Sequence, residues 1–313
     1  MKHEIVPKEW LDSVEVVRGD ITNPKSISLA TEGISNAIHL VAKIGDWGEE
    51  DIHHKVTVEG SRLLFEAALR KKIRVTLASS IVVYGEALQN EICFEERDFG
   101  RFYGPYSRSK QEQENLARNF EEKGMLLSIV RPANVYGPGC EPWVHGVVKQ
   151  LEDRLPSLIS GGHQNAGLVY VDNVVDILIK ASKNPAALGQ CYNIADSDGV
   201  SWNQYVHDLS RFSGSPKPKS IPKFICKPIT SLMELTWKLL GINTRPPLTH
   251  EALNLVTANH RIPISKAREE LGYKPLFNYR EGIEKVGQYL TERSKKAEEN
   301  IKNTKQGKEI AES

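Results

Sequence analysis

Residues 106–110 of this chain read Tyr-Ser-Arg-Ser-Lys, and residues 75–85 before them read Val-Thr-Leu-Ala-Ser-Ser-Ile-Val-Val-Tyr-Gly. Residues four apart on a helix share one face, so the side chains of Tyr106 and Lys110 can reach the same pocket. A phenol with a pKa of about 10 exchanges protons poorly at neutral pH, but a neighbouring cation favours the phenolate and lowers that pKa. With a serine hydroxyl from the end of the preceding strand, this pair suits hydride transfer at a secondary alcohol.

Apolar runs alternate with helical patterns along the chain. Runs at 14–17, 37–42, 75–78 and 126–130 predict strands, and the segments 51–70 and 107–123 between them predict helices. The first of these helices has its apolar stripe at Ile52, Val56, Leu63 and Ala67. Such alternation predicts an α/β fold with a doubly wound parallel sheet that helices cover on both faces.

The residues that follow the four apolar runs are Asp20, Ala42, Ser80 and Pro132. Ligands of open parallel sheets bind outside the carboxyl ends of the strands. We therefore expect these positions to lie along one rim of the sheet.

Composition excludes several classes of function. The net charge of the 313-residue chain is +1, which gives no electrostatic reason to expect nucleic-acid binding. Four cysteines without C-x-x-C spacing (Cys93, Cys140, Cys191 and Cys226) predict a reducing, cytoplasmic compartment and no zinc site. No signal peptide is expected, because the first residues are charged and no apolar run follows them.

The most hydrophobic late stretch, residues 224–242, contains Lys227, Glu234 and Lys238 and is too polar to span a bilayer. We expect a helix of the core or of a C-terminal lobe. The alternatives are an amphipathic helix that rests on a membrane, or one that lines an apolar substrate pocket.

The serines, the Tyr-x-x-x-Lys pair and the stretch from Arg131 to Gly139 stand in an order that resembles the extended short-chain dehydrogenase/reductase superfamily, especially its 3β-hydroxysteroid dehydrogenase-like branch. The resemblance covers about residues 13–290 and implies a Rossmann-like sheet. It implies a region that binds NAD or NADP over residues 1–140, a substrate lobe with returning sheet elements over 141–290, and a charged tail over 291–313.

By resemblance, Tyr106 is the general acid/base, Lys110 lowers its pKa and contacts the nicotinamide ribose, and Ser80 bonds the substrate oxygen, with Ser79 as a weaker rival. The implied cofactor-binding residues are Ser79, Tyr106 and Lys110 together with Asp20, Ile21, Ala42, Pro132, Ala133 and Val135, and the implied substrate contacts are Asn134 and Tyr136. A homodimer is also implied, through the helices at 51–70 and 107–123.

The sequence departs from this family at the phosphate-binding turn. Relatives begin with a strand, a Gly-x-x-Gly-x-x-Gly turn and a helix that holds the cofactor pyrophosphate. The first 35 residues here contain only Gly19 and Gly33, and residues 14–22 instead resemble the family's third strand. We expect that the chain is a truncated form and binds NAD(P) poorly alone. The alternative is a short homologue that has lost dinucleotide binding.

A second departure is Thr57, where the family usually has asparagine; we take it as tolerated variation. The stretches 168–174 and 265–275 resemble the steroid-dehydrogenase group, and no cluster of Arg and Lys suited to a sugar nucleotide follows Pro138. The predicted function is oxidation or reduction of a secondary alcohol or ketone on an apolar, sterol-like substrate. The alternatives are a nucleotide-sugar epimerase or dehydratase, and a non-catalytic binding protein.

Overall fold

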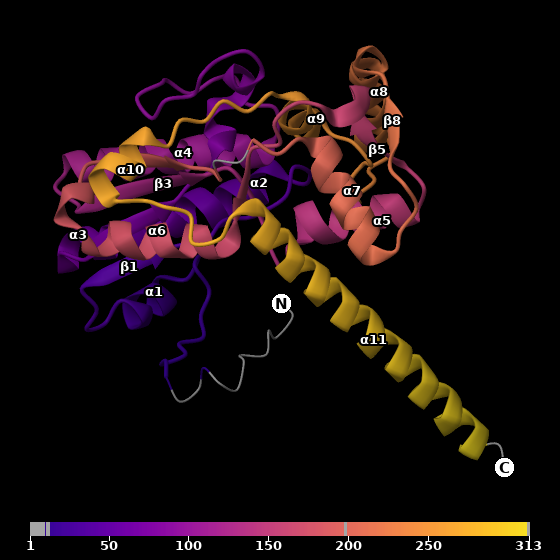
Figure 1. Ribbon diagram of the computed structural model, residues 1–313. Helices are drawn as coiled ribbons and strands as arrows, with labels where there is room; N and C mark the ends of the chain where they lie inside the picture. Colours follow the sequence, from indigo (N-terminus) through magenta and orange to yellow (C-terminus); the bar gives the residue numbers. More distant parts are fainter. Residues whose placement is uncertain (1–9, 11–12, 197–198, 312–313) are drawn as a thin grey trace.

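A parallel sheet of four strands forms the centre of the molecule (Figure 1). The computed structural model describes residues 10, 13–196 and 199–311, with the side chains of 296–311 left out. The strand order is β1-β2-β3-β7, and every neighbouring pair is parallel. The strands are β1 (Asn36–His39), β2 (Arg74–Ala78), β3 (Leu127–Pro132) and β7 (Cys191–Ile194).

Helices cover both faces of this sheet. α3 (Gly60–Lys71) and α4 (Pro105–Glu122) pack on one face, and α6 (Val171–Lys183) packs on the other (Figure 1). Successive strand residues point to opposite faces, so Ile129 enters the α3–α4 core while Val130 enters the α6 core. The predicted α/β fold with a parallel sheet is confirmed.

The helical segment that leads into α3 contains a π-helical turn. α2 (Glu50–His53) continues through η2 (His54–Glu59) into α3. A π turn adds a residue and rotates the face that follows it. The predicted apolar stripe is therefore only partly correct: Ala67 is buried, but Ile52 is 43% exposed.

Residues 14–17, predicted as a strand, are irregular, and Val14, Val16 and Val17 are exposed. Within the described ranges no strand pairs with the outer edge of β1, so these residues have no sheet position to occupy. α1 (Pro24–Ala30) follows and packs on α3. The N-cap of α1 is Asn23, whose side chain accepts a hydrogen bond from the backbone N–H of Lys25.

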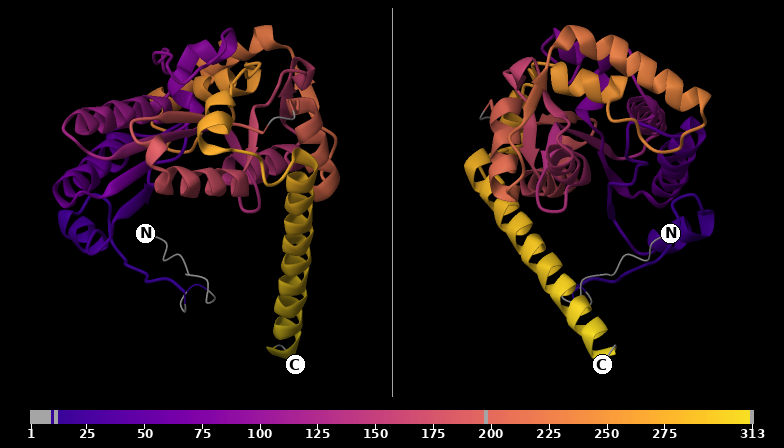
Figure 2. Two further views of the ribbon diagram at one scale, coloured as in Figure 1. Left: turned by 60° about the vertical axis from the view of Figure 1, so that its left-hand side comes forward. Right: turned by 90° about the vertical axis from the view of Figure 1, so that its right-hand side faces the viewer.

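A second group of elements forms the C-terminal lobe. Its core combines aromatic side chains from β4 (Asn134–Tyr136), β6 (Leu168–Tyr170), α7 (Trp202–Ser213) and α11 (Tyr279–Ala311). These side chains include Tyr136, Tyr170, Trp202 and Tyr205. α11 packs on α7 with its first turns and then projects from the body (Figures 1 and 2). The remaining elements are η3 (Ile81–Gln89), η4 (Glu141–His145), α5 (Gly146–Glu152), β5 (Pro156–Ile159), η5 (Ser160–Gly162), η6 (Pro185–Ala187), β8 (Lys219–Ile221), α8 (Lys223–Leu239), α9 (His250–Thr257) and α10 (Ser265–Leu271).

α8 is a lobe helix with an exposed apolar face. It buries Cys226 and Thr230 but leaves Phe224, Leu232 and Leu239 more than half exposed. Among the described residues, no helix is both long enough and apolar enough to cross a membrane.

Candidate active site

The two serines lie where β2 ends. Ser80 has extended backbone angles, and its hydroxyl accepts the backbone N–H of Val82 at 3.3 Å, so it caps the start of η3. The Ser79 hydroxyl is buried and finds no hydrogen-bond partner within the described part of the chain. Both hydroxyls therefore lie at the carboxyl edge of the sheet, and that of Ser79 is free to accept or donate.

Tyr106 is the second residue of α4, which begins with Pro105 after the N-cap Gly104. Proline suits the first helical turn because its fixed φ matches the helix and no N–H is lost there. The side chains of Tyr106 and Ser80 are hydrogen-bonded. The structure thus brings together two of the three predicted catalytic groups.

The pKa of Tyr106 differs from the expectation. Burial and the carboxyl of Glu251 raise the pKa of Tyr106 to about 12, and the hydrogen bond from Ser80 only partly opposes them. Lys110 does not lower the pKa of Tyr106 in this structure as predicted. Desolvation of the phenol and a nearby carboxyl both disfavour the phenolate.

Lys110 reaches from α4 to the end of β2. Its Nζ donates to the carbonyl oxygen of Ala78 at 2.8 Å and to Oε1 of Gln113 at 2.5 Å, and the side chain is 2% exposed. Burial lowers the pKa of Lys110 to about 8, while the carboxylate of Glu114 acts in the opposite direction. The ammonium is therefore fixed one helical turn from Tyr106, next to the strand that carries Ser80.

A buried polar network extends from Lys110 towards β1. Nε2 of Gln113 donates to Oγ of Ser61 at 2.7 Å, and Oγ of Ser61 lies 2.7 Å from Nε2 of His39. Burial and Lys110 lower the pKa of His39 to about 3, so His39 is neutral at physiological pH. The sequence analysis missed this network; the signal was a histidine inside the apolar run at 37–42 and a glutamine three residues after the lysine.

Arg131 and Glu114 attach α4 to β3. The guanidinium Nη2 lies 2.7 Å from Oε2 and Nε lies 3.0 Å from Oε1 of the carboxylate, with side-chain exposures of 5% and 1%. The remaining guanidinium nitrogen donates to the Tyr84 hydroxyl at 2.9 Å and to the Glu95 carbonyl at 3.0 Å. The pair is therefore desolvated but fully hydrogen-bonded, as a buried charge requires.

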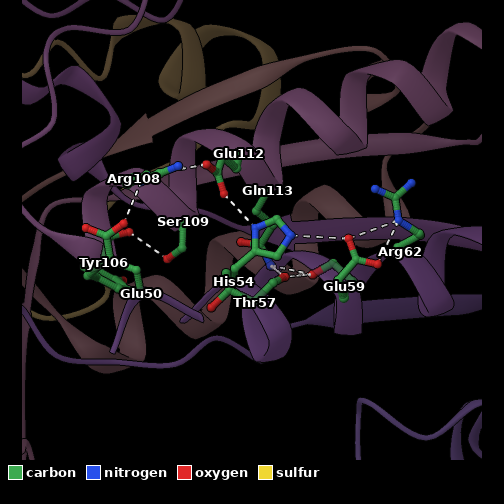
Figure 3. A network of polar contacts seen from close by, with 11 residues as sticks. Glu50, His54, Thr57, Glu59, Arg62, Tyr106, Arg108, Ser109, Glu112 and Gln113 are labelled. Atoms are coloured by element: carbon green, nitrogen blue, oxygen red, sulfur yellow. Dashed lines mark hydrogen bonds and ion pairs between the residues drawn. The ribbon is translucent and has the colours of Figure 1, made fainter. Parts of the chain in front are cut away.

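The outer face of α4 carries a chain of exposed charges that links it to α2 and η2 (Figure 3). His54 lies between two carboxylates, 3.0 Å from Glu112 and 3.5 Å from Glu59, and Arg108 contacts Glu112 at 3.0 Å and Glu50 at 2.7 Å. Exposed pairs of this kind contribute only about 0–1 kcal/mol each, so burial sets the position of α4 more than these contacts do.

The residues predicted for the adenosine side lie in the segment before α1, which contacts the start of α3, and in the loop after β1. Oδ1 of Asp20 accepts the backbone N–H of Thr22 at 2.8 Å, and this bond lowers the pKa of Asp20. Ile21 packs so closely on Gly60 that a side chain there would lie 2.9 Å from it. Ala42 is half-buried, and the next backbone N–H, that of Lys43, donates to the Thr57 hydroxyl at 2.9 Å. Threonine at 57 therefore still orders this loop.

Pro132 and Ala133 are buried beside β7, and Val135 is half-buried in β4. Asn134 donates through Nδ2 to the Ala166 carbonyl at 2.7 Å, and Tyr136 is fully buried among aromatic rings. The side chains of Asn134 and Tyr136 hold the lobe together, so we do not retain them as substrate contacts.

The polar side chains at this edge of the sheet are of the kinds that suit one end of a dinucleotide. The unpartnered Ser79 hydroxyl, the fixed Lys110 ammonium and the Tyr106 phenol are the donors that a nicotinamide ribose needs. In the described ranges, no strand leads through a glycine-rich turn into a helix that could hold a pyrophosphate, and the first turn of α2 carries Glu50 and Asp51. Among the same residues, no group of His, Cys, Asp and Glu is arranged to hold a metal ion.

Comparison with known proteins identifies the relatives of this chain. It is 25% identical to a 2-alkyl-3-oxoalkanoate reductase of Stenotrophomonas maltophilia over 90% of the chain and 88% of the relative. It is 26% identical to a 3β-hydroxysteroid-dehydrogenase/decarboxylase of Arabidopsis thaliana, with 87% of the chain covering 51% of that protein.

Solved structures share the fold. UDP-glucuronic acid 4-epimerase from Bacillus cereus, in complex with NAD, superposes with a TM-score of 0.68 at 22% identity, over 91% of this chain and 84% of the epimerase. The family model that describes the NAD dependent epimerase/dehydratase family matches residues 2–195. The chain therefore belongs to the NAD dependent epimerase/dehydratase family.

Proposed function

We propose that this chain takes part in NAD(P)-dependent hydride transfer between a secondary alcohol and a ketone. The observation that carries the proposal is the hydrogen-bonded pair of Tyr106 and Ser80 at the carboxyl edge of the sheet, with the buried Lys110 ammonium one turn away. NAD(P), when bound, supplies or accepts the hydride.

The chain's own residues handle the substrate oxygen and its proton. Ser80 donates a hydrogen bond to the oxygen, and Tyr106 gives up its proton when a ketone is reduced or takes one up when an alcohol is oxidised. Lys110 holds the ribose. Because the pKa of Tyr106 is raised to about 12, the phenol is the resting form and is ready to act as the acid. General acid–base assistance of this kind contributes about 10²–10⁴-fold in rate.

An apolar substrate is favoured over a sugar nucleotide. Relatives of similar identity include a steroid dehydrogenase and a reductase of alkyl-oxoalkanoates, whose names specify a sterol skeleton and an alkyl-substituted keto acid. The exposed apolar residues of α8 offer such a compound a route of approach from a membrane, and Lys223, Lys227 and Lys238 accompany them. We therefore propose peripheral membrane contact through α8.

The other expected properties stay predictions. Oligomerisation through α2–α3 and α4 would place the charged face of Figure 3 between two copies. Light scattering tests this, and a mass that stays monomeric at every concentration contradicts it. The cytoplasmic location and the domain boundary at residue 140 also remain predictions.

Titration with NADH, followed by nicotinamide fluorescence, tests the proposal. The proposal is supported if NADH binds with a micromolar Kd and if Lys110→Met weakens this binding. Activity with sterols or alkyl ketones then identifies the substrate. No binding at millimolar NADH would contradict the proposal for this polypeptide. Turnover of UDP-sugars without turnover of apolar ketones would favour the epimerase alternative.

A further inference from the structure

The helix that carries Tyr106 and Lys110 has no side chain at its N-cap to accept the backbone N–H groups of its first turn. Its N-cap is Gly104, so the first backbone N–H groups need an acceptor from elsewhere. Glu251 of α9 provides one: Oε1 accepts the backbone N–H of Ser107 at 3.1 Å, and Oε2 lies 3.3 Å from Oγ of Ser107. A carboxyl of the C-terminal lobe thus caps the catalytic helix, one residue after Tyr106.

Gly104 and Glu251 fit one another. A Cβ atom on Gly104 would lie 2.1 Å from Oε2 of Glu251, so glycine makes room for the carboxyl. Glu251 is 3% exposed and lines a small pocket together with Tyr103 and Ser107. Its neighbour on α9, Asn254, donates to the Gly85 carbonyl at 2.8 Å. α9 therefore contacts both α4, which carries Tyr106, and η3, which Ser80 caps.

Asp46, in the loop that follows β1, fixes the first turn of α9. Oγ1 of Thr249 caps this helix by accepting the backbone N–H of Ala252 at 3.1 Å, and it lies 2.5 Å from Oδ2 of Asp46. Arg245 binds the same aspartate through Nε at 2.5 Å. The first turn of α9, which carries Glu251, is therefore attached to the sheet region as well as to α4.

The charge of Glu251 depends on pH in the range where enzymes work. Burial raises the pKa of Glu251 to about 8, with Asp46 acting in the same direction and the Ser107 hydrogen bonds and Arg245 opposing. At pH 7 the carboxyl is mostly neutral, and it accepts the backbone N–H of Ser107 through Oε1 and the Ser107 hydroxyl through Oε2. Above pH 8 it is charged, and a charge on Glu251 raises the pKa of Tyr106.

We propose that Glu251 is a positioning residue: from the C-terminal lobe it holds the first turn of α4, and hence Tyr106, and its negative charge opposes formation of the Tyr106 phenolate. The consequence for catalysis rests on the proposed function. Reduction of a ketone needs the neutral phenol and oxidation of an alcohol needs the phenolate, so an ionised Glu251 favours reduction and limits oxidation at alkaline pH.

Nuclear magnetic resonance of the protein labelled with ¹³Cζ-tyrosine tests the electrostatic part without cofactor or substrate. The Tyr106 signal is identified by its loss in Tyr106→Phe. We expect this signal to shift in a step near pH 8 as Glu251 ionises. Glu251→Gln preserves an acceptor for the Ser107 N–H but carries no charge, so it should abolish the step.

Lys110 also titrates near pH 8, so Lys110→Met is the control, and the step should persist in it. Asp46→Asn keeps the test decisive if Glu251→Gln does not fold: removing a carboxylate that raises the pKa of Glu251 should move the step to lower pH. A step that is absent from the wild-type protein, that survives in Glu251→Gln, or that Lys110→Met abolishes would overturn the proposal.

Kinetics test the consequence separately. At pH 9, Glu251→Gln should oxidise alcohols about threefold to tenfold faster than the wild type, because the phenolate forms more readily. Glu251→Leu, which also removes the cap, should lower kcat at every pH. An unchanged pH profile in Glu251→Gln would contradict the catalytic consequence. Loss of all hydride transfer would count against the proposed function and leave the resonance experiment valid.

Discussion

Replacing Glu114 with leucine tests how the catalytic helix is held on the sheet. Glu114 lies on α4, four residues after Lys110, and its carboxylate pairs with Arg131 of β3 through bonds of 2.7 and 3.0 Å. In the variant the guanidinium keeps its bonds to the Tyr84 hydroxyl and the Glu95 carbonyl but loses its counter-charge. A charge is then left buried without compensation.

The magnitude follows from the burial of both partners. With side-chain exposures of 5% and 1%, neither charge is screened by water, so breaking the pair should cost about 3–5 kcal/mol in the free energy of unfolding. Replacing both partners by apolar residues, as in Glu114→Leu with Arg131→Met, removes the desolvation cost along with the attraction. The double variant should therefore be more stable than Glu114→Leu alone.

Urea denaturation of the wild type, the two single variants and the double variant measures this coupling. An exposed pair, Lys149 and Asp153 at 2.9 Å, is the matched control, and Asp153→Ala should change the stability by less than about 1 kcal/mol. The reasoning fails if Glu114→Leu costs as little as that control, or if the losses of the two single variants simply add in the double variant.

Three further outcomes are expected. Tyr106→Phe should lower kcat by about 10²–10⁴-fold and leave the Kd for NADH unchanged, as measured by fluorescence titration; weaker NADH binding with an intact kcat would refute its role as the acid. Folding raises the pKa of Glu251 from 4.5 to about 8, so the folded state holds the carboxyl proton more tightly than the unfolded state does. The resulting contribution to the free energy of unfolding is fully present below pH 4.5 and is lost as the pH rises to about 8. Relative to Glu251→Gln, the wild type should therefore lose up to about 4 kcal/mol between pH 5 and pH 8 in urea titrations, and parallel pH profiles of the two proteins would contradict this. Leu235→Glu on the exposed face of α8 should reduce sedimentation with anionic lipid vesicles, whereas Leu29→Glu, at a similarly exposed leucine on α1, should have less effect; equal binding by all three proteins would exclude α8 as the contact.

Local sequence patterns were sufficient to predict the parallel sheet, whereas the catalytic roles of Tyr106 and Ser80 stay predictions. Strands at 75–78 and 126–130 were predictable because each is a short apolar run bounded by a helix and a loop. The strand at 14–17 was not, because a strand needs a neighbour, and a local pattern does not report whether one exists. The prediction that Lys110 lowers the pKa of Tyr106 was wrong for a similar reason: burial and Glu251, 145 positions along the chain, set that pKa.

Different segments of α4 contact two different parts of the molecule. Lys110 and Glu114 are bonded to β2 and β3, so the middle of the helix is fixed to the sheet by buried, charge-assisted bonds. The first turn is instead bonded to Glu251 of the C-terminal lobe. Tyr106 lies in that first turn, one turn away from the sheet contacts. A shift of the lobe would therefore be transmitted to the first turn of α4, and so to the backbone of Tyr106, before it reached Lys110.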